Sequence, residues 1–209
     1  MYNSPKSLRG FTLIELLAVM AIIAILGTVG IVGYQKFQIS GQTSETEAKL
    51  AMLGSRAGLY ETAKGDFPPD NFSAVGSTTG NDINVGIEAL VAAFASKTPI
   101  MGVSAIDTKD LINSDEDTFS KAMTSYPARD AFEVKDSWGN PIIYFHRKSY
   151  GKKQTVLLKK RGDSEPRECS VDAVPDPVTK SYKGSSSCQL ISAGYDGEYG
   201  TEDDIIVTP

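Results

Sequence analysis

The stretch FTLIELLAVMAIIAILGTVGIVGY, residues 11–34, decides the architecture of this chain. It is apolar apart from a single charge, Glu15, and the next charged residue is Lys36. A helix needs roughly 20 apolar residues to cross the ~30 Å hydrocarbon core of a bilayer. The core of a cleaved signal peptide is shorter, at about 7–15 residues. The sequence therefore predicts a retained transmembrane helix over residues 11–34.

The ten residues before this helix, MYNSPKSLRG, are polar and carry two positive charges, Lys6 and Arg9. Positive residues next to an apolar segment favour the cytoplasmic side of a membrane. We therefore expect a single-pass membrane protein with its N-terminus in the cytoplasm and the rest of the chain across the membrane.

Glu15 is the anomaly of the apolar segment. A carboxylate at the centre of a membrane helix costs about 2.5–3.5 kcal/mol on insertion scales, and less near an end. No cation within the segment can neutralise it, which suggests a partner on another molecule. The alternative is a carboxylate that stays at the level of the lipid headgroups or takes up a proton.

The hexapeptide GFTLIE, residues 10–15, resembles the prepilin peptidase site of type IV pilins and type II secretion pseudopilins. The resemblance implies cleavage between Gly10 and Phe11, followed by methylation of the new Phe11 amine. It also implies that Glu15 of one subunit pairs with the Phe11 ammonium group of its neighbour. Cleavage would thus create the cation that the apolar segment lacks.

The helix is expected to continue to Lys64 and to end at Gly65, before Pro68. Its second half shows small and apolar residues at helical spacing. These are Phe37, Gly41, Ser44, Ala48, Leu50, Ala51, Leu53, Ala57 and Tyr60. We therefore divide the chain into a leader (residues 1–10), a transmembrane and assembly helix (11–34), and a periplasmic domain (35–209) that includes the rest of the helix.

Shorter elements follow in the domain. Residues 86–95 predict a short helix, and a second helix is possible over residues 117–125. Residues 142–147 and 155–160 predict a hairpin that turns at Tyr150-Gly151, and residues 189–192 and 205–207 predict the last strands. The expected fold is α+β, with a small antiparallel sheet packed on the long helix.

Further blocks resemble the major pseudopilin of type II secretion systems. They are GDFP at residues 65–68, GIEAL at 86–90, DSWGNP at 136–141 and the C-terminal GYDGEYGTEDDI at 194–205. Two segments, 100–135 and 161–187, look like insertions, and Ser137 stands where that family usually has proline. The resemblance implies a structural filament subunit and not an enzyme. It also implies a place in the bacterial inner membrane, with the C-terminal domain in the periplasm, and a periplasmic filament once assembled. Its implied partners are further copies of itself, a prepilin peptidase, minor pseudopilins, an inner-membrane platform and an assembly ATPase.

The C-terminal block is acidic and rich in glycine. Its five carboxylates are Asp196, Glu198, Glu202, Asp203 and Asp204. Calcium prefers about six to eight oxygen ligands, and the ligand spacing here differs from that of an EF-hand. The resemblance implies a structural calcium ion held by the side chains of Asp196, Asp203 and Asp204 and by carbonyl groups near Ala193 and Thr201. The alternative is a solvated acidic tail.

The remaining features narrow the function further. The net charge of −5 disfavours nucleic acid as a partner. Cys169 and Cys188 would close a loop of roughly 20 residues in an oxidising compartment, or would be two unrelated buried thiols. No catalytic motif is present, and His146, the only histidine, is expected at the surface or half-buried. The basic Arg147 and Lys148 are expected on a solvated hairpin face.

Two rival functions remain open beside the pseudopilin. One is a type IV pilin that forms a surface fibre for adhesion or motility. The other is a membrane-anchored, calcium-dependent binding domain that does not polymerise.

Overall fold

The computed structural model describes residues 11–74, 78–98 and 100–209, without the side chains of residues 27–32 and 74. It divides into two compact units, Met1–Gly41 and Gln42–Pro209. The long helix α1 (Leu13–Lys64) passes through the boundary between them. The sequence predicts a different boundary, between residues 34 and 35, where the helix would leave the membrane. Contacts within the chain do not test that boundary, so it stays a prediction.

In the first unit, the described side chains of α1 are mostly apolar and exposed. The large hydrophobic side chains from Phe11 to Leu26 are between 48% and 83% exposed. Within the described part of the chain, no helix combines the length and apolarity that crossing a membrane requires.

The second part of α1 buries one face against the domain. Thr46, Leu50, Leu53 and Ala57 are fully buried, and their spacing of three to four residues places them on one side of the helix. The expected stripe is thus wrong in part, because Ala48 and Ala51 are exposed. Small residues fit either a close packing or a solvated face, so their spacing alone does not choose the buried side.

Gly65 ends α1, as expected. Its φ of +81° lies in the left-handed region, where a side chain is strained. Its N–H donates to the carbonyl oxygen of Glu61 at 2.7 Å, which satisfies one of the last carbonyl groups of the helix.

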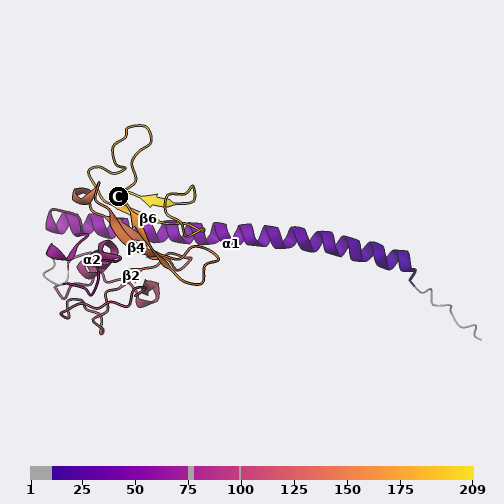
Figure 1. The fold of residues 1–209 in the computed structure, drawn as a ribbon, viewed down its shortest axis with the longest axis horizontal. Coiled ribbons are helices and arrows are strands. Elements are labelled where there is room, and N and C mark those ends of the chain that lie inside the picture. The colour runs from indigo at the N-terminus through magenta and orange to yellow at the C-terminus, as the bar shows by residue number, and fades with distance from the viewer. Residues whose placement is uncertain (1–10, 75–77, 99) are drawn as a thin grey trace, which may run out of the picture. The chain divides into compact units, whose positions relative to one another are not determined.

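Among the described residues, the strands form three antiparallel sheets, and Figure 1 labels one strand of each. The central sheet has the order β3 (Ile143–Phe145), β6 (Gln189–Ser192), β7 (Ile205–Val207). A second sheet pairs β4 (Gln154–Leu158) with β5 (Arg167–Val171), and a third pairs β1 (Leu111–Ile112) with β2 (Glu133–Val134). The α+β class is therefore confirmed, although the strands form three small sheets and not one.

Strands β3 and β6 of the central sheet are buried on both faces, whereas β7 is half-buried. On one face, Ile142, Tyr144 and Leu190 join the main core with Leu50 and Leu53 of α1. On the other face lies a second hydrophobic cluster. It contains Ile143, Phe145 and Ile191 of the central sheet and Val156, Leu158 and Val171 of the β4–β5 pair. Successive residues of a strand point to opposite faces, so this alternation builds a layered domain: helices, central sheet, hairpin.

The expected hairpin between residues 142–147 and 155–160 is wrong. Both strands form, but Ile143 of β3 pairs with Ile191 of β6, and Val156 of β4 pairs with Cys169 of β5. The short 3-10 helix η3 (Arg147–Ser149) separates β3 from β4. Strand β5 lies within residues 161–187, one of the two segments that look like insertions. Its sequence, RECSV, carries charged residues and only one buried side chain. It therefore lacks the alternation of apolar and polar residues that would predict a strand.

The rest of the domain has short elements. Helix α2 (Val85–Phe94) confirms the expected short helix, and the 3-10 turns η1 (Phe72–Ala74) and η2 (Thr108–Asp110) flank it in sequence. The possible helix over residues 117–125 is wrong, since these residues form bends and isolated bridges. Phe119 packs instead against Phe72, with ring centroids 5.3 Å apart.

Candidate functional site

The N-terminal segment presents its first functional residues at the start of α1. Gly10 lies outside the described residues. Phe11 is 83% exposed. Thr12 immediately precedes the helix and bonds to Glu15 in both directions. The backbone N–H and the hydroxyl of Thr12 each donate to Oε2 of Glu15 at 2.8 Å, and the N–H of Glu15 donates to the Thr12 hydroxyl at 3.3 Å.

This arrangement is a capping box, in which an N-cap threonine and a glutamate three residues later satisfy each other's backbone donors. Glu15 therefore has a local hydrogen-bond partner within its own chain, Thr12, in addition to any partner on another molecule. The signal was present in the spacing of Thr12 and Glu15. The hydrogen bonds that the structure shows for this carboxylate use Oε2, and Oε1 is not among their acceptors.

The C-terminal loop holds the three aspartates expected to bind calcium near one another, but their carboxylate oxygens do not all lie within 4.8 Å of one another. Oδ2 of Asp203 accepts from the N–H of Asp196 at 3.0 Å, and Oδ2 of Asp204 accepts from the N–H of Gly200 at 2.8 Å. The loop closes tightly at Gly194, where an added Cβ would lie 2.4 Å from the carbonyl oxygen of Asp203. Ala193 is fully buried beside this turn.

Asp204 provides the observation that tests the fit of a cation. Its Oδ1 is buried and has no hydrogen-bond partner. Burial, then the nearby carboxylates of Asp203 and Asp196, raise the pKa of Asp204 to about 6. An unpaired oxygen among like charges is the environment that a cation would relieve. Oxygen atoms are the type of donor that calcium prefers, so calcium at this loop stays a prediction.

Other acidic residues of the loop have different roles. Glu198 faces Lys160, with Oε1 2.5 Å from its ammonium nitrogen, and lies 3.8 Å from the Arg167 guanidinium group. Glu202 is exposed. The hydroxyl of Thr201 donates to Oδ1 of Asp203 at 2.5 Å.

The tryptophan turn is joined to this loop. Oδ1 of Asp136 accepts from the N–H groups of Trp138 and Asn140, both at 2.9 Å, and its Oδ2 accepts from the Ser192 hydroxyl at 2.7 Å. The Trp138 ring lies edge-on to Tyr195, with centroids 6.5 Å apart. Two sequence blocks separated by more than 50 residues therefore form one structural feature.

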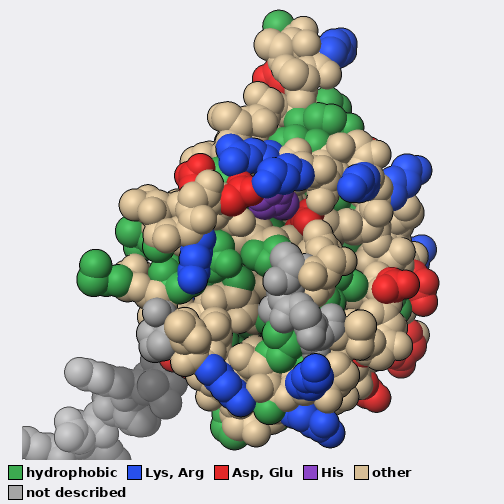
Figure 2. Space-filling model, turned by 90° about the vertical axis from the view of Figure 1, so that its left-hand side faces the viewer, with side chains coloured by type: hydrophobic (Ala, Val, Ile, Leu, Met, Phe, Trp, Pro, Cys, Tyr) green, Lys and Arg blue, Asp and Glu red, His purple; other side chains and the backbone are tan. Residues whose placement is uncertain are grey.

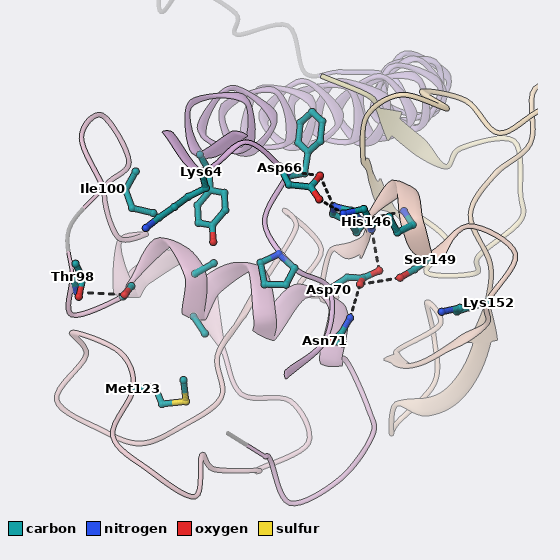
Figure 3. A pocket seen from close by; sticks show the side chains of 17 residues that line it. Lys64, Asp66, Asp70, Asn71, Thr98, Ile100, Met123, His146, Ser149 and Lys152 are labelled. Atoms are coloured by element: carbon teal, nitrogen blue, oxygen red, sulfur yellow. Dashed lines mark hydrogen bonds and ion pairs between the residues drawn. The ribbon is translucent and has the colours of Figure 1, made fainter. Parts of the chain in front are cut away.

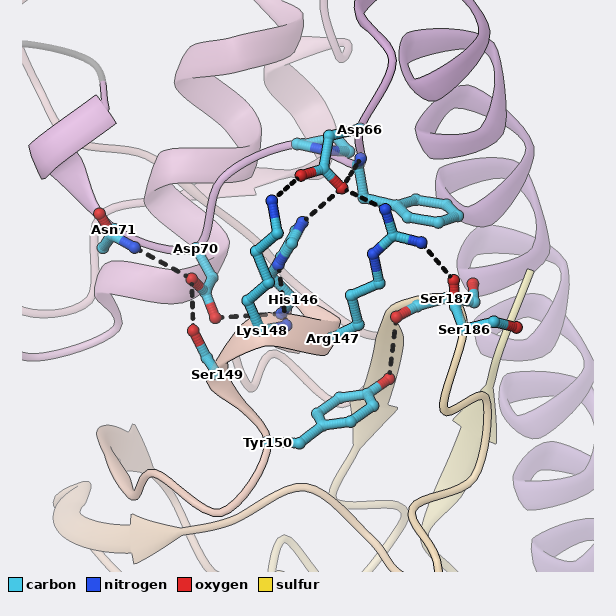
Figure 4. A network of polar contacts seen from close by, with 12 residues as sticks. Asp66, Asp70, Asn71, His146, Arg147, Lys148, Ser149, Tyr150, Ser186 and Ser187 are labelled. Carbon is cyan, nitrogen blue, oxygen red and sulfur yellow. Dashed lines mark hydrogen bonds and ion pairs between the residues drawn. The ribbon is translucent and has the colours of Figure 1, made fainter.

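A network of charges surrounds Asp66 (Figure 4). Its Oδ1 lies 2.8 Å from the Arg147 guanidinium group and 3.2 Å from Nε2 of His146, and its Oδ2 accepts from the Lys148 ammonium group. Nδ1 of His146 accepts from the N–H of Lys148, so the ring hydrogen resides on Nε2 and points to Asp66. The Lys148 ammonium, followed by His146, holds the pKa of Asp66 well below its usual range.

Two expectations from the sequence are corrected here. His146 is buried, at 6% exposure, because Asp66 and Asp70 supply the partners that its own neighbourhood in sequence lacks. Arg147 and Lys148 do not lie on a hairpin face. They belong to η3 and bind the carboxylate that follows the end of α1.

The network lines one side of a pocket of about 550 Å³ (Figure 3). Asp70, His146 and Ser149 point into it from one side, and Ile100 and Met123 lie across from them. Lys and Arg side chains gather with acidic and histidine side chains on this face of the domain (Figure 2). Asp66 thus binds two cations and the imidazole of His146, and the network connects the end of α1 with η3.

The two cysteines are free thiols in the structure. Cys188 lies in the main core, where burial raises the pKa of its thiol to about 12. Cys169, on β5, packs against the second hydrophobic cluster. A bond between them stays a prediction, which intact mass under non-reducing conditions would check.

Comparison with known proteins bears on the N-terminus. Residues 6–31 match the family model described as the prokaryotic N-terminal methylation motif. The motif indicates a type IV pilin-like protein, either a pilin or a pseudopilin, and this class is structural and not enzymatic. It implies processing by a prepilin peptidase and membrane-anchored assembly into a filament. No curated protein and no solved structure matches the chain.

Proposed function

We propose that the chain is a structural subunit of a type II secretion pseudopilus, anchored by α1 in the bacterial inner membrane and then drawn into a periplasmic filament. The observation that carries this proposal is the methylation motif over residues 6–31. It overlaps the start of a helix whose large hydrophobic side chains, from Phe11 to Leu26, are exposed. A helix of this kind buries its apolar side chains in lipid before assembly and against other subunits afterwards.

Assembly would follow from the chemistry at the start of the mature chain. Cleavage after Gly10 creates an ammonium group on Phe11. Thr12 holds one oxygen of Glu15, at 2.8 Å, and so orients the carboxylate. The other oxygen is then available to the Phe11 ammonium group of the next subunit. Because such a contact joins two different surfaces, it repeats without closing and produces a filament.

The pseudopilin is favoured over the pilin by the C-terminal half. The tryptophan turn and the acidic loop, which both resemble blocks of the major pseudopilin, are joined through Asp136 and Ser192 at 2.7 Å. In this proposal Asp196, Asp203 and Asp204 hold a calcium ion together with the carbonyl groups of Ala193 and Thr201. When bound, calcium would neutralise the carboxylates of the loop.

A surface pilin is the second candidate. The β4–β5 hairpin, with β5 at Arg167–Val171, extends into a segment that looks like an insertion relative to the pseudopilin family. Long extracellular fibres made of this subunit would favour the pilin. Filaments confined to the periplasm, together with loss of protein secretion when the chain is deleted, would favour the pseudopilin.

The test begins with intact mass of the protein from its native cells. A mass equal to residues 11–209 plus one methyl group is expected, whereas the full-length mass would contradict processing. The second step is Glu15→Gln. We expect it to abolish filaments while cleavage and membrane insertion persist, because a neutral glutamine side chain lacks the charge that binds an ammonium group.

The matched control is Glu165→Gln, which makes the same chemical change at an exposed position of the β4–β5 loop. Filaments should form normally with this variant. If Glu15→Gln assembles as well as Glu165→Gln, the pairing of Glu15 with the Phe11 ammonium group is wrong. If neither the wild type nor Glu15→Gln forms filaments and function is intact, the chain is a membrane-anchored binding domain and the filament proposal is wrong.

A further inference from the structure

Three acidic side chains from separate parts of the sequence meet inside the domain. They are Glu88 in α2, Asp115 in the loop after β1, and Glu133 in β2, and one oxygen from each lies within 4.8 Å of the other two. Glu88 and Glu133 are fully buried and Asp115 is half-buried. Among the described residues, no other trio of His, Cys, Asp or Glu side chains is so close.

The carboxylate of Glu88, one of this cluster of three acids, accepts no hydrogen bond among the described residues. Both of its carboxylate oxygens are buried without a hydrogen bond, and the same holds for both oxygens of Asp115. The ion pairs found between described residues include none of the three acids. A buried carboxylate without a partner is strongly unfavourable. A fully buried Glu88 directed at two further carboxylates therefore points to a ligand.

Glu133, in contrast, is firmly held. Its Oε1 accepts from Nδ2 of Asn84 and from the Ser114 hydroxyl, both at 2.7 Å, and its Oε2 accepts from the N–H of Ser114 at 3.1 Å. Asn84 is fixed in turn, because its Oδ1 accepts from the N–H of Leu157 at 3.0 Å. Second-layer hydrogen bonds of this kind orient the ligands of metal sites.

We propose that Glu88, Asp115 and Glu133 bind one calcium ion, at a site separate from the C-terminal loop. Calcium binds oxygen at about 2.3–2.6 Å, so two ligands on opposite sides of the ion lie roughly 5 Å apart. The observed spread of 4.8 Å is compatible with one shared ion. All the donors are oxygen atoms, which suit calcium better than zinc.

Asn113, two residues before Asp115 in the sequence, offers a further buried oxygen. Oδ1 of Asn113 is also buried without a partner, while its Nδ2 donates to the carbonyl oxygen of Asp117 at 2.8 Å. Side-chain amide oxygens are common calcium ligands, and water would complete the coordination. Burial, followed by the carboxylates of Asp117, Asp115 and Glu133, raises the pKa of Glu88 to about 11. Without the ion, Glu88 would hold a proton, which calcium displaces.

The site would attach the segment 100–135 to helix α2. That segment has only two-residue strands, β1 and β2, as regular sheet structure. One ion shared by α2, the loop after β1, and β2 would tie this segment to the helix. Calcium would therefore stabilise this part of the domain as well as the C-terminal loop.

The experiment counts calcium ions on the full-length protein in detergent, by equilibrium dialysis against calcium chloride at neutral pH. Glu88→Gln is expected to lower the bound calcium by one ion per chain. Asp204→Asn, which changes the C-terminal loop, should leave the Glu88-dependent ion in place. If the wild type binds only this one ion, the C-terminal loop is excluded as a site while the present proposal stands.

Asp115→Asn provides a second variant at a less buried position, in case Glu88→Gln perturbs folding. It too is expected to lose one ion, with unchanged far-ultraviolet circular dichroism. The proposal is overturned if both variants bind as many calcium ions as the wild type, or if the wild type binds none. Magnesium bound at this site in preference to calcium would overturn the assignment of the ion. None of these counts depends on filament assembly.

Discussion

Asp66 and Glu15 are both carboxylates at an end of α1, and each is stabilised by different donors. At the start of the helix, Glu15 is held by the neutral N–H and hydroxyl groups of Thr12, three residues away. Just past the end of the helix, Asp66 is held by Arg147, Lys148 and the imidazole of His146, about 80 residues away in the sequence. Local spacing thus encodes the first contact, and only folding creates the second.

The Asp66 network predicts a specific loss of stability. Hydrogen bonds between charged partners contribute about 1.5–3 kcal/mol. Partial exposure reduces this value, so Asp66→Asn should lower the free energy of unfolding at pH 7 by about 1–2 kcal/mol. Since the pKa of Asp66 is lowered on folding, its contribution is present above the unfolded value of about 4 and fades as the pH falls below it.

Urea unfolding of the full-length protein in detergent, at pH 7 and at pH 3, measures this effect. The control is Asp163→Asn, which breaks the exposed pair of Asp163 with Arg167 at 3.1 Å and should change stability by less than about 0.5 kcal/mol. Equal losses in the two variants at pH 7 would mean that the Asp66 network adds nothing beyond a surface ion pair.

At the scale of elements, α1 shows how the same residue type serves opposite purposes. Gly65 has a φ of +81° and ends the helix, whereas Gly58 lies within it, and no heavy atom would come within 4 Å of a Cβ added at either position. A side chain added at either glycine would therefore meet no neighbour, and the two positions differ only in backbone conformation.

The two glycines predict opposite effects of one substitution. Gly65→Ala should destabilise the protein by about 1 kcal/mol, because an L side chain is strained in the left-handed region. Gly58→Ala should stabilise it by about 0.5–1 kcal/mol, because alanine has the higher helix propensity. Thermal unfolding of both variants in parallel checks the signs. A stabilised Gly65→Ala would show that the helix continues past this residue.

At the scale of the whole molecule, buried carboxylates couple folding to protons and cations. Burial raises the pKa of Glu133 to about 7 and that of Asp117 to about 6, and Asp204 rises to the same value. In the absence of metal, the folded protein therefore binds more protons than the unfolded chain between about pH 4 and pH 7. Its stability should fall as the pH rises through this range.

Calcium should remove most of this dependence. A cation lowers the pKa of the carboxylates that it binds and stabilises the folded state by about 2.7 kcal/mol at a concentration 100 times its dissociation constant. Urea midpoints at pH 5 and pH 7.5, in calcium-free buffer and with added calcium, measure the difference. If stability falls by the same amount from pH 5 to pH 7.5 with and without calcium, the proposal that Glu133 and Asp204 bind cations is contradicted.

Short-range features account for what the sequence determined by itself. The apolar run after Gly10, the glycine that ends α1, helix α2 and the last two strands depend on neighbouring residues, so their patterns could be interpreted directly. The methylation motif belongs to the same category. The capping box of Thr12 and Glu15 also depends only on residues three positions apart, so the sequence predicts it as well.

Tertiary structure alone decided the rest, because long-range partners leave no local signal. The pairing of β4 with β5, the burial of His146 by Asp66, and the meeting of Glu88 with Asp115 and Glu133 all join segments that are separate in sequence. A strand shows which residues alternate but not which strand will bury them. The sequence around a single acid likewise does not indicate which distant acids will lie close to it. It is the repulsion among such buried carboxylates that favours binding of a cation.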